Sequence, residues 1–154
     1  MKLRELCDKL ESWAPLAYQE SYDNSGLIVG SLDQVVSGVL ISLDCIESVV
    51  DEAIEKNCNV IVAHHPIVFK GLKTLTGKNY VERTVLKAIK NDIALYAIHT
   101  NLDNVDTGVN KAIANRLGLI NTEVLVPKRG LLKKLITFVP KANVEEVRSA
   151  LFDG

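Results

Sequence analysis

Short apolar runs alternate with amphipathic helical patterns along most of this chain, and this alternation limits the fold more than any other feature. Runs rich in Val, Ile and Leu occupy residues 37–44, 59–64, 93–99 and 122–127. Between them, apolar residues recur at helical spacing over 46–54, 81–89 and 109–117. Strands that alternate with helices favour a parallel sheet covered on both faces. We therefore predict an α/β fold with a largely parallel sheet and helices on both faces.

The first thirty residues add a helix and a further apolar run. Leu3, Leu6, Leu10 and Trp13 lie at helical spacing before Pro15, which predicts an amphipathic N-terminal helix. A polar loop, QESYDNSG, follows and leads into the short apolar stretch GLIVG.

Composition narrows the class of protein. The 154 residues are 47% hydrophobic and 24% charged, with a net charge of −1, which is typical of a globular chain long enough for one real core. No Lys/Arg run indicates a nucleic-acid or membrane surface, and no stretch approaches the roughly 20 apolar residues of a membrane span. The three cysteines lack CxxC spacing, so we expect reduced thiols and a cytoplasmic protein.

Three of the predicted strands run into polar residues at their carboxyl ends, where ligands bind in sheets of this kind. The polar residues after these strands are Asp44; His64 and His65; and His99, Asn101, Asp103 and Asp106. All three histidines of the chain therefore follow two strands, which is the strongest chemical signal in the sequence.

The adjacent histidines indicate a metal site. Successive residues of a strand point to opposite faces, so His64 and His65 could serve two neighbouring ions at the strand end rather than chelate one. Asp103, from the loop after the next strand, would complete the set. Imidazole with carboxylate suits zinc, iron, nickel or manganese.

Each of these residues also has a structural interpretation. The histidine pair before Pro66 could form a strand-end turn with hydrogen-bonded rings, and His99 could make one hydrogen bond. We assign Asp106 to a helix N-cap, and Asp44 to a capping box with Glu47. No nucleophile elbow, P-loop or GxGxxG motif is present.

Three motifs, YDNSGLIVG, AHHPIVFKG and HTNLDNVDTGVN, resemble in order and spacing the Nif-three-like family, also called GTP cyclohydrolase 1 type 2 homologues. The resemblance covers residues 1–127, with Tyr22 where many relatives have Trp. It implies an αβα fold, a centre of two divalent metal ions and a homohexameric ring. His64 and His65 would each bind one ion, and Asp103 would be a third ligand. His99, beside the centre, would act either as a catalytic proton-transfer group or in support of the metal ligands.

The end of the chain departs from the family pattern. The family completes its centre with a C-terminal GHxxxE motif, whereas no histidine follows His99 here. Residues 133–140 read as a strand and 143–154 as a helix, which resembles the start of a small α+β inserted module. We therefore expect residues 1–127 to be the first half of the metal-binding domain and 128–154 to begin a truncated β-α module.

The resemblance implies a two-metal-dependent hydrolase that acts on a small molecule, with a nucleotide as the expected substrate. A non-catalytic metal-binding scaffold or protein-interaction module is the alternative. An open coordination position would favour the enzyme, and a closed ligand shell would favour the scaffold.

Overall fold

The computed structural model describes residues 1–127 and 134–153. It divides into two compact units, Met1–Ile120 and Asn121–Gly154. The domain boundary after residue 127 stays a prediction.

The first unit holds the helices and strands that the alternation predicted, with two short additions. In chain order they are α1 (Leu3–Trp13), the 3-10 helix η1 (Leu16–Tyr18), β1 (Gly26–Val29), β2 (Val39–Ser42), α2 (Glu47–Glu55), β3 (Val60–Ala63), α3 (Tyr80–Lys90), β4 (Ala94–Ala97), α4 (Thr100–Asp103) and α5 (Val109–Arg116). The second unit contains the 3-10 helix η2 (Lys141–Asn143) and α6 (Val144–Asp153).

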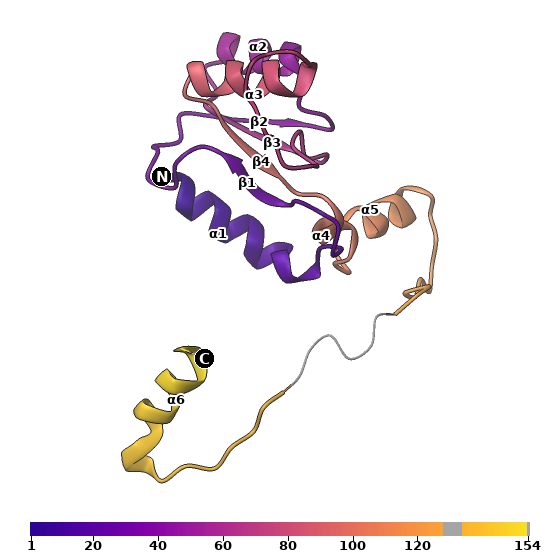
Figure 1. Cartoon of the computed structure of the whole chain (residues 1–154). Coiled ribbons are helices and arrows are strands. Elements are labelled where there is room, and N and C mark those ends of the chain that lie inside the picture. The colour runs from indigo at the N-terminus through magenta and orange to yellow at the C-terminus, as the bar shows by residue number, and fades with distance from the viewer. Residues whose placement is uncertain (128–133, 154) are drawn as a thin grey trace. The chain divides into compact units, whose positions relative to one another are not determined.

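The strands form one sheet in the order β1-β4-β3-β2. β2, β3 and β4 are parallel, and β1 joins the β4 edge antiparallel. Figure 1 shows α2 and α3 on one face of this sheet and α1 on the other. The predicted α/β class, with a largely parallel sheet between helices, is confirmed.

The core consists of two clusters, one on each face of the sheet. Val60 and Val62 of β3 pack in the cluster that contains Leu3 of α1, whereas Ile61 packs in the cluster that contains Val50 of α2. Alternate residues of a strand face opposite ways, so a strand covered on both faces is apolar throughout. Every residue of β3 and β4 is buried. At about 1.5–3 kcal/mol for each large apolar side chain, these two strands anchor the unit.

The strand register brings four chain segments to one edge of the sheet. Ala63 is paired with Ser42 on one side and with Ala97 on the other, so the three parallel strands end level. Gly26, the first residue of antiparallel β1, is paired with the same Ala97. The loops after β2, β3 and β4 and the loop before β1 therefore meet at this edge.

The two predicted helix caps are wrong. The N-cap of α2 is Ile46, without a side-chain hydrogen bond, so Asp44 and Glu47 form no capping box. The N-cap of α5 is Gly108 rather than Asp106, again without a side-chain cap. A Cβ atom at Gly108 would lie 1.9 Å from the carbonyl oxygen of Leu102. The backbone therefore packs too closely there for any residue with a side chain.

Two predicted strands are absent from the part of the second unit that the structure describes. Residues 122–127 and 134–140 form no strand, and Lys133 of the predicted 133–140 strand lies outside the described residues. Leu125 and Phe138 are 95% and 96% exposed. An apolar run becomes a strand only where a neighbour completes its backbone hydrogen bonds, and neither run has one among the described strands. The helix predicted at 143–154 is α6.

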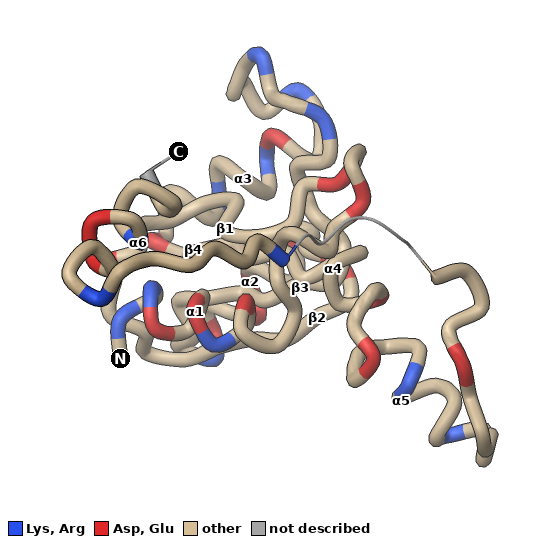
Figure 2. The backbone as a smooth tube through the Cα atoms, turned by 90° about the horizontal axis from the view of Figure 1, so that it is seen from below, with Lys and Arg blue, Asp and Glu red and all other residues tan. Residues whose placement is uncertain are grey.

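Charges of both signs are interspersed along the chain. Figure 2 shows Lys and Arg positions close to Asp and Glu positions on α1, in keeping with the net charge of −1. None of the helices within the described ranges has the length and apolar character needed to cross a membrane.

Candidate metal centre

The three histidines come together at the shared edge of the sheet. His64 and His65 follow β3, and His99 follows β4. One ring nitrogen from each lies within 4.8 Å of the others. The ring centroids are 5.0 Å apart for His64–His65, 5.2 Å for His64–His99 and 5.7 Å for His65–His99. We call these three side chains the histidine cluster.

Each ring is held through its Nδ1 atom by an oxygen that accepts a hydrogen bond. His64 Nδ1 lies 2.9 Å from the carbonyl oxygen of Ile98, and His65 Nδ1 lies 2.7 Å from Asp44 Oδ1. His99 Nδ1 lies 2.8 Å from Asp23 Oδ1. A carbonyl or carboxylate fixes the neutral ring with its proton on Nδ1 and leaves Nε2 with a free lone pair. Histidines that bind metal ions in proteins are held in this way.

The backbone explains why adjacent histidines can face one region. β3 ends at Ala63, so both residues lie beyond the regular strand. His64 N still donates to the carbonyl group of Ser42, the last residue of β2, and His65 N donates to that of Leu43, which follows it. Their rings are then anchored on opposite sides, one at the end of β4 and the other after β2. That His64 and His65 serve two neighbouring ions stays a prediction.

Asp23 is the most strongly held carboxylate of the site. Its side chain is completely buried. Besides His99, it accepts hydrogen bonds from Asn24 N at 2.7 Å, from Ser25 Oγ at 3.0 Å, and from the backbone N of Thr100 at 3.1 Å and the Thr100 hydroxyl. Burial alone would raise the pKa of Asp23, but the hydrogen bonds from Thr100, His99 and Asn24 outweigh it and hold that pKa well below the usual range. Asp23 therefore stays ionised and keeps the His99 ring oriented.

Asp103 lies beside the histidine cluster. Its Oδ2 atom is 4.0 Å from His64 Nε2, and its side chain is 35% exposed. The four-residue helix α4, which sequence periodicity did not predict, carries Asp103 back toward the strand ends. The buried Asn101 fixes this turn, because it accepts from His99 N at 2.9 Å and donates to the Ala14 carbonyl at 2.7 Å.

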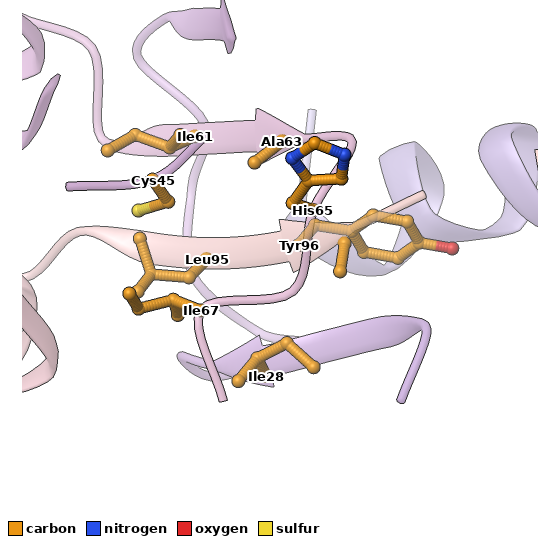
Figure 3. A pocket seen from close by; sticks show the side chains of 9 residues that line it. Ile28, Cys45, Ile61, Ala63, His65, Ile67, Leu95 and Tyr96 are labelled. Atoms are coloured by element: carbon orange, nitrogen blue, oxygen red, sulfur yellow. The ribbon is translucent and has the colours of Figure 1, made fainter. Parts of the chain in front are cut away.

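A small cavity reaches His65 from the core. Figure 3 shows His65 just beyond the end of β3, with Cys45, Ile61, Leu95 and Ile67 among the other side chains that line the cavity. The cavity measures about 10 Å³, room for about one water molecule. Pockets that enclose drug-sized ligands are typically about 300–1,000 Å³. Burial raises the pKa of the Cys45 thiol to about 11, so this thiol remains protonated at neutral pH.

The structure thus places His64, His65, His99 and Asp103, the four residues selected from the sequence, at one site. It adds Asp23 and Asp44, which sequence reasoning did not select. Asp44 was interpreted as a helix cap, although its position directly after a strand was a usable signal. Asp23 lies in the polar loop before β1, and no local pattern marks it as a partner of His99.

These features define a class of protein: an α/β protein in which a histidine-rich cluster at the carboxyl edge of the sheet could bind a metal ion. The family model described as Duf34/NIF3 (NGG1p interacting factor 3) matches residues 1–152. The chain therefore belongs to the Duf34/NIF3 family, which confirms the resemblance inferred from the three motifs.

Individual relatives agree with this assignment. The chain is 44% identical over 149 residues to a Bacillus subtilis (strain 168) protein named GTP cyclohydrolase 1 type 2 homolog, covering 96% of this chain and 40% of the relative. A Bacillus cereus protein related to NIF3 has a TM-score of 0.78 and 42% identity, covering 99% of this chain and 42% of that one. Reduced HcgD from Methanocaldococcus jannaschii has a TM-score of 0.75 and 33% identity, covering 82% and 50%.

The length of the relatives bears on function. This chain spans 40% of the Bacillus subtilis relative and 50% of one from Clostridium acetobutylicum. The activity, substrates and partners of the longer relatives therefore cannot be assigned directly to this chain.

Proposed function

We propose that His64, His65 and Asp103 bind divalent metal ions and that the protein is a metal-dependent hydrolase. One observation carries the proposal: all three rings are anchored through Nδ1 to oxygen acceptors, with ring nitrogens from the three gathered within 4.8 Å. Three rings ordered in this way on a partly exposed sheet edge are more than a structural turn requires.

His64, His65 and Asp103 are the proposed ligands, and two ions are the proposed number. His64 and His65 are anchored on opposite sides, which suits one ion each, and paired ions in hydrolases lie about 3.5–4 Å apart. Imidazole and carboxylate donors fit zinc, iron, nickel or manganese. When bound, such ions lower the pKa of coordinated water toward neutrality.

His99 has two candidate roles. The family resemblance implies a proton-transfer role, and the orientation of the ring by the ionised Asp23 supports that role. A ring nitrogen of His99 lies within 4.8 Å of ring nitrogens of His64 and His65, which also supports a role as a metal ligand. Loss of metal affinity in His99→Ala would indicate a ligand, whereas loss of turnover at unchanged metal affinity would indicate proton transfer.

A nucleotide is the proposed substrate. The support is the name GTP cyclohydrolase 1 type 2 homolog carried by the relatives, which is an association rather than a property of the site. A second function, a metal-binding scaffold for protein partners, is favoured by the words "interacting factor" in the family description.

The test is metal content followed by turnover. The 154-residue chain and the longer Bacillus subtilis relative would be titrated with Zn²⁺, Mn²⁺, Fe²⁺ and Ni²⁺ by calorimetry, and then incubated with GTP and a nucleotide panel. Metal-dependent consumption of a nucleotide by the relative, abolished by substitution of the residue aligned with His65, would support the hydrolase. Tight metal binding with a closed ligand shell and no turnover would support the scaffold.

The oligomeric state and the cellular compartment are also proposed. We propose a homohexamer in the cytoplasm. The thiols Cys7, Cys45 and Cys58, all free of disulfides, support a reducing compartment. Light scattering on the 154-residue chain and on the Bacillus subtilis relative would test the assembly.

A further inference from the structure

Two exposed aromatic side chains lie beside the histidine cluster. Tyr22 is 64% exposed and Phe69 is 47% exposed. Their ring centroids are 6.2 Å apart, and the Phe69 ring lies 6.4 Å from the His99 ring at an angle of 83°. Many large apolar residues in this chain are exposed, so exposure alone carries little weight. The informative feature is the position of this pair next to His99. We call Tyr22 and Phe69 the aromatic surface.

The loops that carry the two rings are tied together. Asn24 Nδ2 donates to the carbonyl oxygen of Val68 at 2.6 Å, so the loop before β1 is fixed to the loop after β3. Tyr22 directly precedes Asp23, the buried partner of His99. The aromatic surface is therefore built on anchored backbone, and a ligand that used it would not need to order these loops first.

The space around the site indicates where a ligand would lie. The cavity under His65, at about 10 Å³, is far smaller than a ligand pocket and is lined mainly by apolar side chains. A substrate that reaches the histidines must then approach from the open side of the sheet edge, where Tyr22 and Phe69 are exposed. Exposed aromatic rings bind planar heteroaromatic rings by stacking, and the loss of one such ring typically weakens binding about 5-fold to 100-fold.

We infer that Tyr22 and Phe69 bind a planar heteroaromatic ring of the substrate and hold it against the histidine cluster. The inference rests on the proposed function, because it takes the cluster as the reacting centre. It deepens that proposal by naming the residues that determine which ring is accepted. Sequence reasoning treated Tyr22 only as a minor variation and did not select Phe69.

The experiment measures guanosine binding, because guanosine presents the ring without phosphates. Wild-type chain, Tyr22→Ala and Phe69→Ala would be titrated with guanosine and with ribose, which lacks the ring. Tyr22→Phe and Phe69→Tyr are the matched controls that keep a ring at each position. Each protein would also be titrated with Zn²⁺, and its secondary structure checked by circular dichroism.

We expect guanosine binding to weaken about 5-fold to 100-fold in each alanine variant and to persist in the ring-keeping variants, with Zn²⁺ affinity unchanged. Equal guanosine binding by wild type and both alanine variants would overturn the inference, as would no guanosine binding by a chain that binds Zn²⁺. Ring-dependent guanosine binding by a chain that binds no metal would instead contradict the proposed metal site and leave the aromatic surface supported.

Discussion

The carboxylate of Asp23 lies 2.8 Å from Nδ1 of His99, although 76 positions of sequence separate the two residues. Antiparallel pairing of β1 with β4 creates this contact, because it places the loop before β1 next to the end of β4. A similar contact, between Asp44 and His65, measures 2.7 Å. The difference is burial: the Asp23 side chain is 0% exposed, whereas that of Asp44 is 58% exposed.

We predict that Asp23→Asn weakens Zn²⁺ binding about 10-fold to 100-fold, the usual effect of removing a residue that orients a ligand histidine. An asparagine amide would also direct N–H groups toward the donors of Thr100, which leaves a buried group unpaired and costs about 1–3 kcal/mol of stability. Calorimetric titration and thermal melting would measure the two effects.

Asp44→Asn is the matched control for this substitution. Water can replace the partly exposed Asp44 carboxylate at His65, so we expect a smaller loss of Zn²⁺ affinity and little change in melting temperature. Equal effects of the two substitutions would mean that burial does not determine how firmly these rings are held.

The proposed ligands themselves make a second prediction. His64→Ala, His65→Ala and Asp103→Ala should each reduce Zn²⁺ affinity at least 10-fold while leaving the secondary structure intact, because these residues lie beyond the strand ends and outside the two core clusters. Metal analysis would measure the loss of Zn²⁺ binding, and circular dichroism would show whether the secondary structure is retained. Collapse of the fold in all three variants would favour a purely structural role for the site.

A third prediction concerns Glu82 of α3, a buried carboxylate outside the site. It is 2% exposed. It accepts hydrogen bonds from Thr76 N at 2.8 Å, Thr76 Oγ1 at 3.0 Å, Gly77 N at 2.9 Å, Lys78 N at 3.3 Å and Asn79 Nδ2 at 3.2 Å. Burial would raise the pKa of Glu82, but the hydrogen bonds from Thr76 and Lys78 and the Lys78 charge lower that pKa to about 2.

Glu82→Gln should therefore lower the melting temperature, and the effect should depend on pH. A lowered pKa stabilises the fold above the unfolded value of about 4.3, and this contribution is lost as the pH falls toward about 2. The difference in melting temperature between wild type and Glu82→Gln should be largest near neutral pH, narrow below about pH 4 and close near pH 2. Glu52→Gln, at a half-exposed ion pair with Lys56, is the control. A constant difference from pH 7 to pH 2 would contradict this account.

Local sequence signals predicted the centre of the sheet and the histidines that follow it. β3 and β4 are buried at every position, and such strands are apolar throughout. Once these strands are parallel neighbours, the general rule about their carboxyl ends places His64 and His99 together. The histidines of the site could therefore be predicted from the apolar pattern and the parallel strand order.

The parts that sequence reasoning missed depend on contacts between distant segments. Asp23 becomes a partner of His99 only through the pairing of β1 with β4, which no short pattern encodes. Local capping rules place Asp44 at a helix end. The register of β2 and β3 instead brings its carboxylate within hydrogen-bonding distance of His65. The apolar run at 122–127 has strand composition, yet it pairs with no strand among the described residues.

The last prediction compares two residues that are register partners. Ile41 of β2 pairs with Val62 of β3, so both side chains lie on the same face of the sheet. Val62 is 6% exposed and Ile41 is 81% exposed. Val62→Asp would bury an unpaired charge and should unfold the domain, at a cost of more than about 4 kcal/mol.

Ile41→Asp, the same chemical change one strand away, should alter stability by less than about 1 kcal/mol, because its carboxylate remains in water. Circular dichroism melts of both variants would make the comparison. If Ile41→Asp destabilised the chain as severely as Val62→Asp, the exposed face of β2 would have to be covered in solution, and light scattering would show whether a second copy of the chain covers it.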